Sequence, residues 1–279
     1  MKFQGMKKQL YIEPKLAGVL DLMVRRMKSM RDVVLLVDGH EGEGKSNIAT
    51  MVCSYVAEKT GRSFSVDNVF FDIKDMIAFA KQGKEKIILW DEGALGGLAS
   101  DWWNKSQKLF IKLLMVARKK QHFFVICIPK FYKMNEYIAC DRSIGLIHVY
   151  SADNLERGRF TYYNDNKKDI LFDNWKSKHK KTYKYGYNFH GKFSACLKHL
   201  IDEDAYEKKK DKAIEKIDKT EGRQPDQMKL KLQYAISLLP KKLGITAREL
   251  KKHINIGADT LSNWKNLPKK HDFLRELEL

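Results

Sequence analysis

Residues 33–46 read Val-Val-Leu-Leu-Val-Asp-Gly-His-Glu-Gly-Glu-Gly-Lys-Ser, and this stretch decides the fold. From Gly39 to Ser46 it fits the pattern G-x-x-x-x-G-K-[ST] at every fixed position. An apolar, β-branched run precedes the pattern, and a helix-compatible run, 47–52, follows it. A buried strand, a glycine-rich turn and a helix start in this order are the context in which the pattern indicates a phosphate-binding loop. A glycine-rich turn that a lysine happens to follow is the alternative interpretation.

The spacing of this loop follows from the chemistry of phosphate binding. Glycines let the backbone curl until several N–H groups face one anion, and the next helix adds its free N-terminal donors. Lys45 offers a positive charge to the β- and γ-phosphates, and the Ser46 hydroxyl is placed to coordinate Mg²⁺. The side chains of Glu41 and Glu43 are expected to point outward. We therefore predict that ATP is bound by Gly39, Gly42, Glu43, Gly44, Lys45, Ser46 and Asn47.

A second motif, residues 86–92, reads Lys-Ile-Ile-Leu-Trp-Asp-Glu. Four apolar residues that end in two carboxylates predict a buried strand with acids at its carboxyl end. In open α/β sheets ligands bind outside the carboxyl ends of the strands, so both motifs are expected at one crevice. Asp91 is predicted to serve the metal together with Ser46, and Glu92 to act as the general base that polarises the attacking water. Alternatively, the two acids simply end a core strand at the surface.

Alternating strands and helices predict an α/β fold, with a parallel sheet flanked by helices. The expected strands cover 33–37, 66–71, 87–90, 123–128, 145–150 and 159–163. The expected helices cover 13–30, 45–59, 73–81, 100–120 and 134–140. The predicted segments of the chain are a core, 1–173, a basic extension and linker, 174–225, and a small all-α domain, 226–279.

Composition argues against membrane-spanning and secreted classes of protein. Of the 279 residues 43% are hydrophobic, enough for a core, but no apolar run approaches the roughly 20 residues that span a bilayer. The start of the chain is basic with no apolar segment after it, so no signal peptide is expected. The four cysteines lack metal-site spacing, which indicates free thiols in the cytoplasm.

The charge balance is strongly basic: Lys and Arg total 53 against 35 acids, a formal net charge of +18. Such an excess favours a polyanionic partner, of which nucleic acid is the usual one. An anionic membrane surface is the weaker rival, because no basic amphipathic helix with a broad apolar face stands out. Residues 176–187 mix lysines with tyrosines, which suits a phosphate backbone and stacked bases. A solvated, irregular extension that wraps the core is the alternative for that segment.

Residues 246–264 resemble a helix-turn-helix, in register and without gaps. Thr246 is expected to cap the first helix, and Glu249, three residues on, to complete a capping box. Asn255 stands at the tight turn and tolerates the left-handed conformation. The predicted small core consists of Leu250, Ile254, Ile256, Leu261 and Trp264.

In such a motif the start of the second helix reads the major groove of double-stranded DNA. The base-facing candidates are therefore Ala258, Asp259, Ser262 and Asn263. The candidates that neutralise phosphates are Lys251, Lys252 and Lys265. A helical bundle that binds protein, or that contacts a neighbouring copy of the core, is the alternative.

Taken together, these residues resemble the P-loop ATPases of the FtsK/HerA division, and within it the zonular-occludens-toxin-like (Zot-like) ATPases of phages and viruses. The resemblance covers about 30–193. Its carriers are the 39–46 loop, the strand that ends in Asp91 and Glu92, residues 117–120, the strand 123–128, and Asp141-Arg142 ahead of 145–150. It implies a RecA-like sheet, a homo-oligomeric ring or filament, and ATP-driven movement of DNA or packaging of a genome, in the host cytoplasm if the protein is viral.

The resemblance also concerns two further site elements. An arginine from a neighbouring subunit often stabilises the charge that develops during phosphoryl transfer, and Arg118 and Arg142 match the family positions best. The family usually ends the strand after the acids with a glutamine that senses the γ-phosphate. This chain has Lys130 there, following Pro129.

Three functions remain open at this point. The first is a Mg²⁺-dependent ATPase that acts on double-stranded DNA, in translocation or genome packaging for a virus or mobile element. The second is a regulator or helicase loader in which ATP is a switch and the helix-turn-helix binds one DNA site. The third is a scaffold that binds nucleotide without hydrolysing it, against which the Asp91-Glu92 pair argues.

Overall fold

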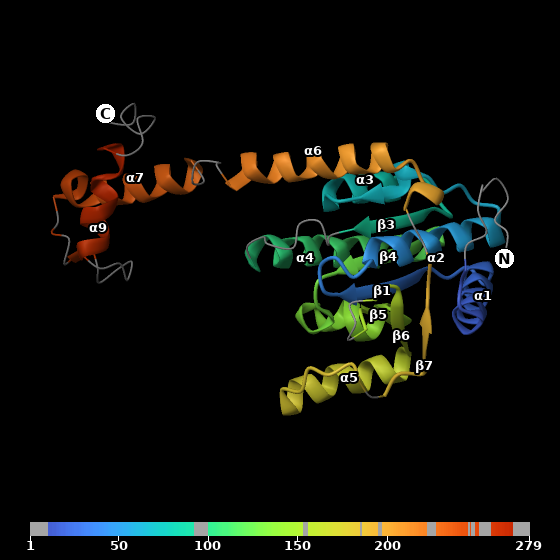
Figure 1. Ribbon diagram of the computed structural model, residues 1–279. Helices are drawn as coiled ribbons and strands as arrows, with labels where there is room; N and C mark the ends of the chain where they lie inside the picture. The colour runs from blue at the N-terminus through green and yellow to red at the C-terminus, as the bar shows by residue number, and fades with distance from the viewer. Residues whose placement is uncertain are drawn as a thin grey trace. The chain divides into compact units, whose positions relative to one another are not determined.

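The computed structural model describes residues 11–91, 100–152, 156–184, 186–194, 197–221, 227–244, 246, 249–250 and 258–269. The chain forms two compact units, Met1–Lys216 and Ile217–Leu279. The first unit is an α/β domain built on one sheet, and the second is helical in its described part (Figure 1).

The sheet of the first unit has seven strands in the order β2-β3-β4-β1-β5-β6-β7 (Figure 1). The strands are β1 (Val33–Gly39), β2 (Val69–Phe70), β3 (Ile87–Asp91), β4 (Phe123–Ile128), β5 (Gly145–Tyr150), β6 (Arg159–Asn164) and β7 (Phe189–Lys192). From β2 to β5 all neighbours are parallel, as predicted. A mostly parallel sheet of this kind is compatible with a RecA-like fold.

The prediction of a parallel sheet is wrong at one end, because β6 pairs antiparallel with both β5 and β7. The connection from β5 to β6, residues 151–158, is too short for the crossover of a dozen or more residues that a parallel neighbour needs. The chain therefore turns directly back from β5 into β6 as a hairpin, and β7 pairs antiparallel with β6.

Helices cover both faces of the sheet. Helices α3 (Ile73–Lys81), α4 (Ser100–Ala117) and α5 (Asp165–Lys178) share one hydrophobic core with the strands. Helix α2 (Lys45–Thr60) packs on β1, β3 and β4, and α1 (Pro14–Lys28) packs on α2 and β1. The core strands are fully buried, which explains their continuous apolar runs.

Most predicted elements are present, with three differences. The strand expected over 66–71 is only two residues long, after a 3₁₀ turn at Val66–Asn68. The helix expected over 134–140 is a π-helix at Tyr137–Arg142. Helix α5 and strand β7 were not among the predicted elements.

A buried lysine anchors α5 to the π-helix. The Lys168 ammonium is fully buried and donates to the carbonyls of Ala139 (2.5 Å) and Cys140 (3.1 Å) and to the Asp169 carboxylate (2.8 Å). Unpaired carbonyls at the end of a helix need such donors when they are buried. The lysine therefore adds hydrogen bonds to two carbonyls of the π-helix, one of which also accepts from the Ser143 hydroxyl (2.7 Å).

The compact units do not follow the predicted segments. The first unit continues to Lys216, and the region 174–225 supplies it with the end of α5, strand β7 and the first part of α6 (Glu203–Glu221). The basic segment after 173 is thus partly built into the sheet.

The second unit has its own small core. Leu230 and Tyr234 of α7 (Gln227–Leu243) are buried and pack with Leu238 and Leu267, and α7 contacts α9 (Ala258–Lys265). The predicted capping box is confirmed: the Thr246 amide donates to the Glu249 carboxylate (2.6 Å), and the Glu249 amide donates to the Thr246 hydroxyl (3.2 Å).

Of the predicted helix-turn-helix core, Leu250 and Leu261 are buried and Trp264 is half-buried. Ile254, Ile256 and the turn at Asn255 lie outside the described residues. Leu250 is thus buried just after the capping box, and Leu261 is buried on α9.

Among the described helices, none combines the length and apolar character that crossing a bilayer requires. Cys53, Cys127 and Cys140 are free thiols, as predicted, and Cys196 lies outside the described residues.

One buried histidine makes the stability of the first unit depend on pH. His122 precedes β4; its Nδ1 accepts from the amide of Lys86 (3.1 Å) and its Nε2 lies 3.0 Å from the Ala80 carbonyl oxygen. Burial lowers the pKa of His122 from 6.5 to about 4. The unfolded chain therefore binds a proton between these values that the folded chain does not, so this stability is complete above pH 6.5 and is lost as pH falls toward 4.

We expect the free energy of unfolding to fall by about 3 kcal/mol over this window because of His122. Denaturant titrations at pH 4.5 and 7 measure it, and His122→Gln should flatten the pH dependence. His40→Gln, at an exposed histidine of the same unit, is the matched control. An equally steep pH dependence in His122→Gln would rule this histidine out as the cause.

Candidate functional site

The glycine-rich loop, residues 39–46, lies at the carboxyl end of β1 and adopts a curled conformation. Gly39, Gly42 and Gly44 have φ values of 145°, 78° and 96°. A Cβ at Gly39 would clash with the carbonyl oxygen of Val149 on the neighbouring strand, so only glycine fits there. Gly44 is the N-cap of α2 and offers no side chain to the first-turn N–H groups of that helix. These donors face a cavity of about 400 Å³ that the loop lines together with α6.

Lys45 closes the loop upon itself. Its side chain is buried, and the ammonium donates to the carbonyl oxygens of Gly39 and His40, both at 2.8 Å. These two carbonyl oxygens therefore hold the Lys45 ammonium inside the curl of the loop. An anion in the cavity would compete with these two carbonyls for the same ammonium.

The strand order brings Asp91 to the same edge of the sheet. Asp91 ends β3 and pairs with Cys127 of β4, which pairs with Val37 of β1. Side chains of residues paired in this way point to the same face. The Asp91 carboxylate is therefore delivered to the face covered by α2, whose first turn carries Ser46.

The Asp91 carboxylate is 99% buried and only half satisfied. Its Oδ2 accepts a hydrogen bond from the Tyr206 hydroxyl (2.7 Å), whereas Oδ1 has no partner among the described residues. Ser46 and Tyr206 line the same cavity. A buried carboxylate oxygen without a partner is costly, and such a site favours a cation or a water.

Tyr206 is a site residue that the sequence did not reveal. It belongs to α6, is buried, and packs its ring edge-on against Phe71 at 5.3 Å. Burial and the Asp91 charge raise the pKa of Tyr206 far above its ordinary value, so the phenol keeps its proton and donates it. The only local signal was a single aromatic residue in a helix otherwise rich in lysine and acids.

The remaining loop candidates fall on two sides. Asn47 and Glu41 line the cavity, and Glu41 is exposed. Glu43 turns aside, and its carboxylate accepts from the Ser151 hydroxyl in the β5–β6 connection. Glu207 and Lys210 of α6 also line the cavity, and their charged groups lie 3.6 Å apart as an ion pair.

Of the three catalytic candidates, Arg142 alone has a side chain within the described part of the chain. Glu92 lies outside the described residues, as does the side chain of Arg118. The backbone of Arg118 lies in a 3₁₀ turn, Arg118–Lys120, that precedes β4 and hence stands at the amino edge of the parallel strands. Lys130, the candidate sensor, is exposed after β4.

Arg142 serves another purpose, and the geometry argues against it as a catalytic arginine. Its guanidinium makes a buried ion pair with Asp32 at 2.5 Å and donates to the Leu114 carbonyl at 3.4 Å. Asp32 precedes β1, so this pair stands at the end of the sheet opposite to the glycine-rich loop.

We expect Arg142→Ala to lower the free energy of unfolding by about 3 kcal/mol, because it leaves the buried Asp32 charge without its partner. Denaturant unfolding measures this, and Asp32→Ala in the same background should recover part of the loss. Unchanged stability together with a large loss of nucleotide hydrolysis would return Arg142 to the catalytic candidates.

The DNA-binding candidates of the second unit lie on an open face where they are described. Asp259, Ser262, Asn263 and Lys265 are exposed on α9, and Leu261 faces the core. Ala258 begins α9, and Lys251 and Lys252 lie outside the described residues. The exposed face of α9 is thus polar and free of the unit's own core.

Ser46 and Asp91 are the candidates for holding a metal ion. In the described part of the chain, no group of three His, Cys, Asp or Glu residues can hold a metal ion alone. Ser46 lines the cavity with Tyr206, which donates to one oxygen of Asp91, and the other oxygen of Asp91 has no partner among the described residues. These two donors fit an ion that takes its other ligands from phosphates and water. No protein-family model matches the chain, and no curated protein is similar to it at a significant level.

Proposed function

We propose that the chain is a Mg²⁺-dependent ATPase whose site is the cavity between the glycine-rich loop and α6. The observation that carries the proposal is the convergence of Lys45, Ser46 and a half-satisfied, buried Asp91 at one edge of the sheet. Positive charge, free helix N–H groups and a carboxylate are the three elements that a metal–triphosphate complex requires.

Each residue then has a defined task. Lys45 leaves the carbonyls of Gly39 and His40 and binds the terminal phosphates. Ser46 and Asp91 would hold Mg²⁺, which neutralises phosphate charge when bound. Glu92 accepts the proton of the attacking water.

The proposed substrate partner is double-stranded DNA. The net charge of +18 supports a polyanionic partner, and the exposed polar face of α9 supports contact with a groove. By its resemblance to FtsK/HerA ATPases, the chain is proposed to work as a homo-oligomer that translocates or packages DNA. Arg118 remains the candidate for an arginine that acts on a neighbouring subunit.

A DNA-binding switch is the second candidate, and Tyr206 is the observation that favours it. Tyr206 donates a hydrogen bond to Asp91 from α6, the helix that continues into the second unit. A metal on the free Oδ1 would neutralise the carboxylate and so weaken the hydrogen bond that Tyr206 donates to Oδ2, which links nucleotide binding to α6 thermodynamically. In this case ATP sets the state of the protein, and the helix-turn-helix does the main work.

Steady-state phosphate release, measured with Mg²⁺ and duplex DNA of increasing length, tests both candidates. Turnover that rises with DNA length supports a translocating ATPase. A footprint at one short DNA sequence with little stimulation of turnover supports the switch. If ATP and Mg²⁺ neither turn over nor raise the melting temperature, the site does not bind nucleotide and both candidates fail.

A further inference from the structure

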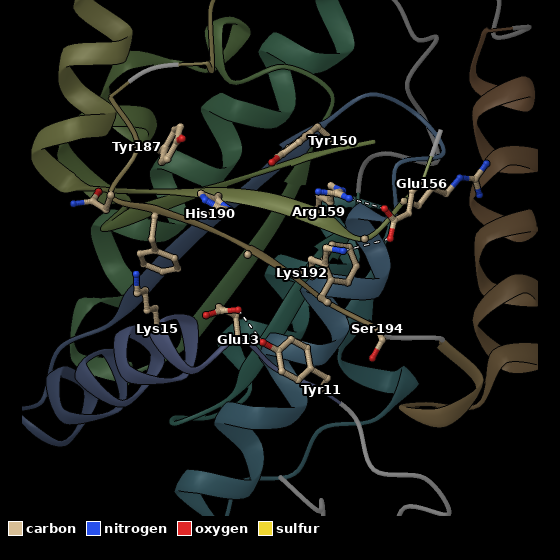
Figure 2. A pocket seen from close by; sticks show the side chains of 16 residues that line it. Tyr11, Glu13, Lys15, Tyr150, Glu156, Arg159, Tyr187, His190, Lys192 and Ser194 are labelled. Atoms are coloured by element: carbon tan, nitrogen blue, oxygen red, sulfur yellow. Dashed lines mark hydrogen bonds and ion pairs between the residues drawn. The ribbon is translucent and has the colours of Figure 1, made fainter. Parts of the chain in front are cut away.

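The antiparallel end of the sheet carries two rows of aromatic and basic side chains on one face. Tyr150 pairs with Arg159, which pairs with Lys192. His148 pairs with Thr161, which pairs with His190, in the adjacent row. Residues opposite one another on neighbouring strands point to the same face. Figure 2 shows Tyr150, Arg159 and His190, with Tyr187, along this stretch of β6 and β7.

Three rings of this face stand nearly parallel. His148 stacks on Tyr183 with centroids 3.6 Å apart and an angle of 6°, and on Tyr150 with 6.2 Å and 12°. The Tyr183 hydroxyl donates to the buried Asp38 at 2.5 Å, and the Tyr183 carbonyl accepts from Tyr163 at 2.6 Å. The rings are therefore fixed before any ligand arrives, and Tyr150, which ends β5, is half-buried.

The segment after α5 supplies positive charge beside these rings. Lys181, Lys184 and Arg159 line a hollow of about 600 Å³ with Tyr150 and Tyr187, and its described lining has no acid. Lys181 and Lys184 make no ion pair with any described residue. Tyr187 stands edge-on to His190 at 6.0 Å and is 36% exposed.

A second hollow continues the first one along β7. Its volume is about 1080 Å³, and it shares Tyr150, Arg159 and Tyr187 with the first. Here Glu156 holds the basic groups in place: it accepts from Arg159 at 2.5 Å and lies 3.5 Å from the Lys192 ammonium (Figure 2). The two hollows adjoin at the three shared residues and are together called the groove, whose second part also contains the acids Glu13 and Glu156.

We propose that this groove binds single-stranded nucleic acid, with bases stacked on Tyr150 and Tyr187 and phosphates beside Lys181 and Lys184. Flat rings with half-exposed faces match unpaired bases, which have π-faces that a duplex buries in its own stack. The lysines match the backbone charge of a strand laid along the rings. All residues of this site belong to the first unit, and the site lies beside the glycine-rich loop, because Tyr183 donates to Asp38, which directly precedes Gly39.

The test measures the affinity of the full chain for a fluorescein-labelled oligothymidine of about 12 nucleotides by fluorescence anisotropy, without ATP. Tyr150→Ala is expected to weaken binding about 5- to 100-fold, the effect of one lost stacking contact. Tyr150→Phe keeps the ring and should bind as the wild type does. Tyr187→Ala, on the exposed segment, is a second variant that does not depend on how Tyr150→Ala folds.

Charge is tested with matched pairs of lysines. Binding weakens as salt rises, and each phosphate contact on a single strand makes the slope of log affinity against log salt steeper by about 0.7. Replacing both Lys181 and Lys184 with alanine should therefore make this slope shallower by about 1.4. Lys74→Ala with Lys112→Ala removes the same charge from exposed positions of α3 and α4 and should leave the slope unchanged. Lys45→Ala should also leave strand binding unchanged, which separates this site from the proposed ATPase.

Four results would overturn the proposal. The first is wild-type affinity in both Tyr150→Ala and Tyr187→Ala. The second is a loss of affinity in Tyr150→Phe as large as in Tyr150→Ala. The third is a change of salt slope in the Lys74 and Lys112 variant as large as in the Lys181 and Lys184 variant. The fourth is loss of binding to phosphatidylserine vesicles in the tyrosine variants while strand binding persists, which would assign the groove to a membrane surface.

Discussion

Replacing Lys45 with alanine is expected to lower ATP turnover by about 10²- to 10³-fold, the usual cost of removing one positioned donor from a charged transition state. The ammonium is the only positive group seen within the curl of the described loop, where it is 2.8 Å from two carbonyl oxygens. Under the proposed function, a triphosphate would replace these carbonyls as the partner of the ammonium. Without it, the loop still offers N–H donors but lacks the point charge that opposes the terminal phosphates.

Binding should change in the same variant. A ligand present at 100 times its dissociation constant stabilises a protein by about 2.7 kcal/mol, so ATP with Mg²⁺ should raise the melting temperature of the wild type. We expect this shift to disappear in Lys45→Ala. The matched control is Lys59→Ala at the other end of α2, where the ammonium is partly exposed and 3.8 Å from Asp21. An ATP-dependent shift that survives in Lys45→Ala would place the nucleotide elsewhere.

The parts of the fold that could be predicted from sequence are those that local pattern determines. Strand β4 and helix α3 occur at the predicted residues, because a continuous apolar run and an amphipathic stretch leave the chain few other ways to bury them. The glycine-rich loop has the positive φ angles that its glycines predict. The capping box of the second unit is equally local and was equally predictable.

The remaining parts depend on contacts between distant residues. Strand β7 has four residues of mixed character, and only its pairing with β6 makes it a strand. The Tyr206–Asp91 hydrogen bond joins residues 115 positions apart, so no local pattern contains it. Arg142 matched a family position, yet the fold brings Asp32 to its guanidinium at the far edge of the sheet. A residue of a sequence motif can be expected near the loop when it ends a strand of the parallel sheet, as Asp91 does. Arg142 does not end such a strand, so its place could not be predicted in this way.

The groove on β5, β6 and β7 could also be predicted only in part from the sequence. The mixture of lysines and tyrosines after α5 was visible in the sequence, but their partners His148, Tyr150 and Arg159 come from strands that precede it. Antiparallel pairing, which was not predicted, aligns these residues on one face. The lysines and tyrosines were thus visible in the composition, but the surface they form depends on the pairing register of β5 and β6.

The second large effect is expected for Glu92→Gln, which should leave ATP binding intact and slow hydrolysis by about 10²- to 10⁴-fold, the range that a general base contributes. Glutamine keeps the size of the side chain and removes its basicity, so the attacking water loses its proton acceptor while the phosphate contacts of Lys45 remain. Asp91→Asn is the informative comparison: Asp91 has a buried oxygen without a partner among the described residues, and removing its charge should weaken Mg²⁺-dependent binding itself. Phosphate release and the ATP-dependent rise in melting temperature, measured on both variants, separate the two roles. Full turnover in Glu92→Gln would remove that carboxylate from the mechanism and leave hydrolysis to a base supplied by another residue or another subunit.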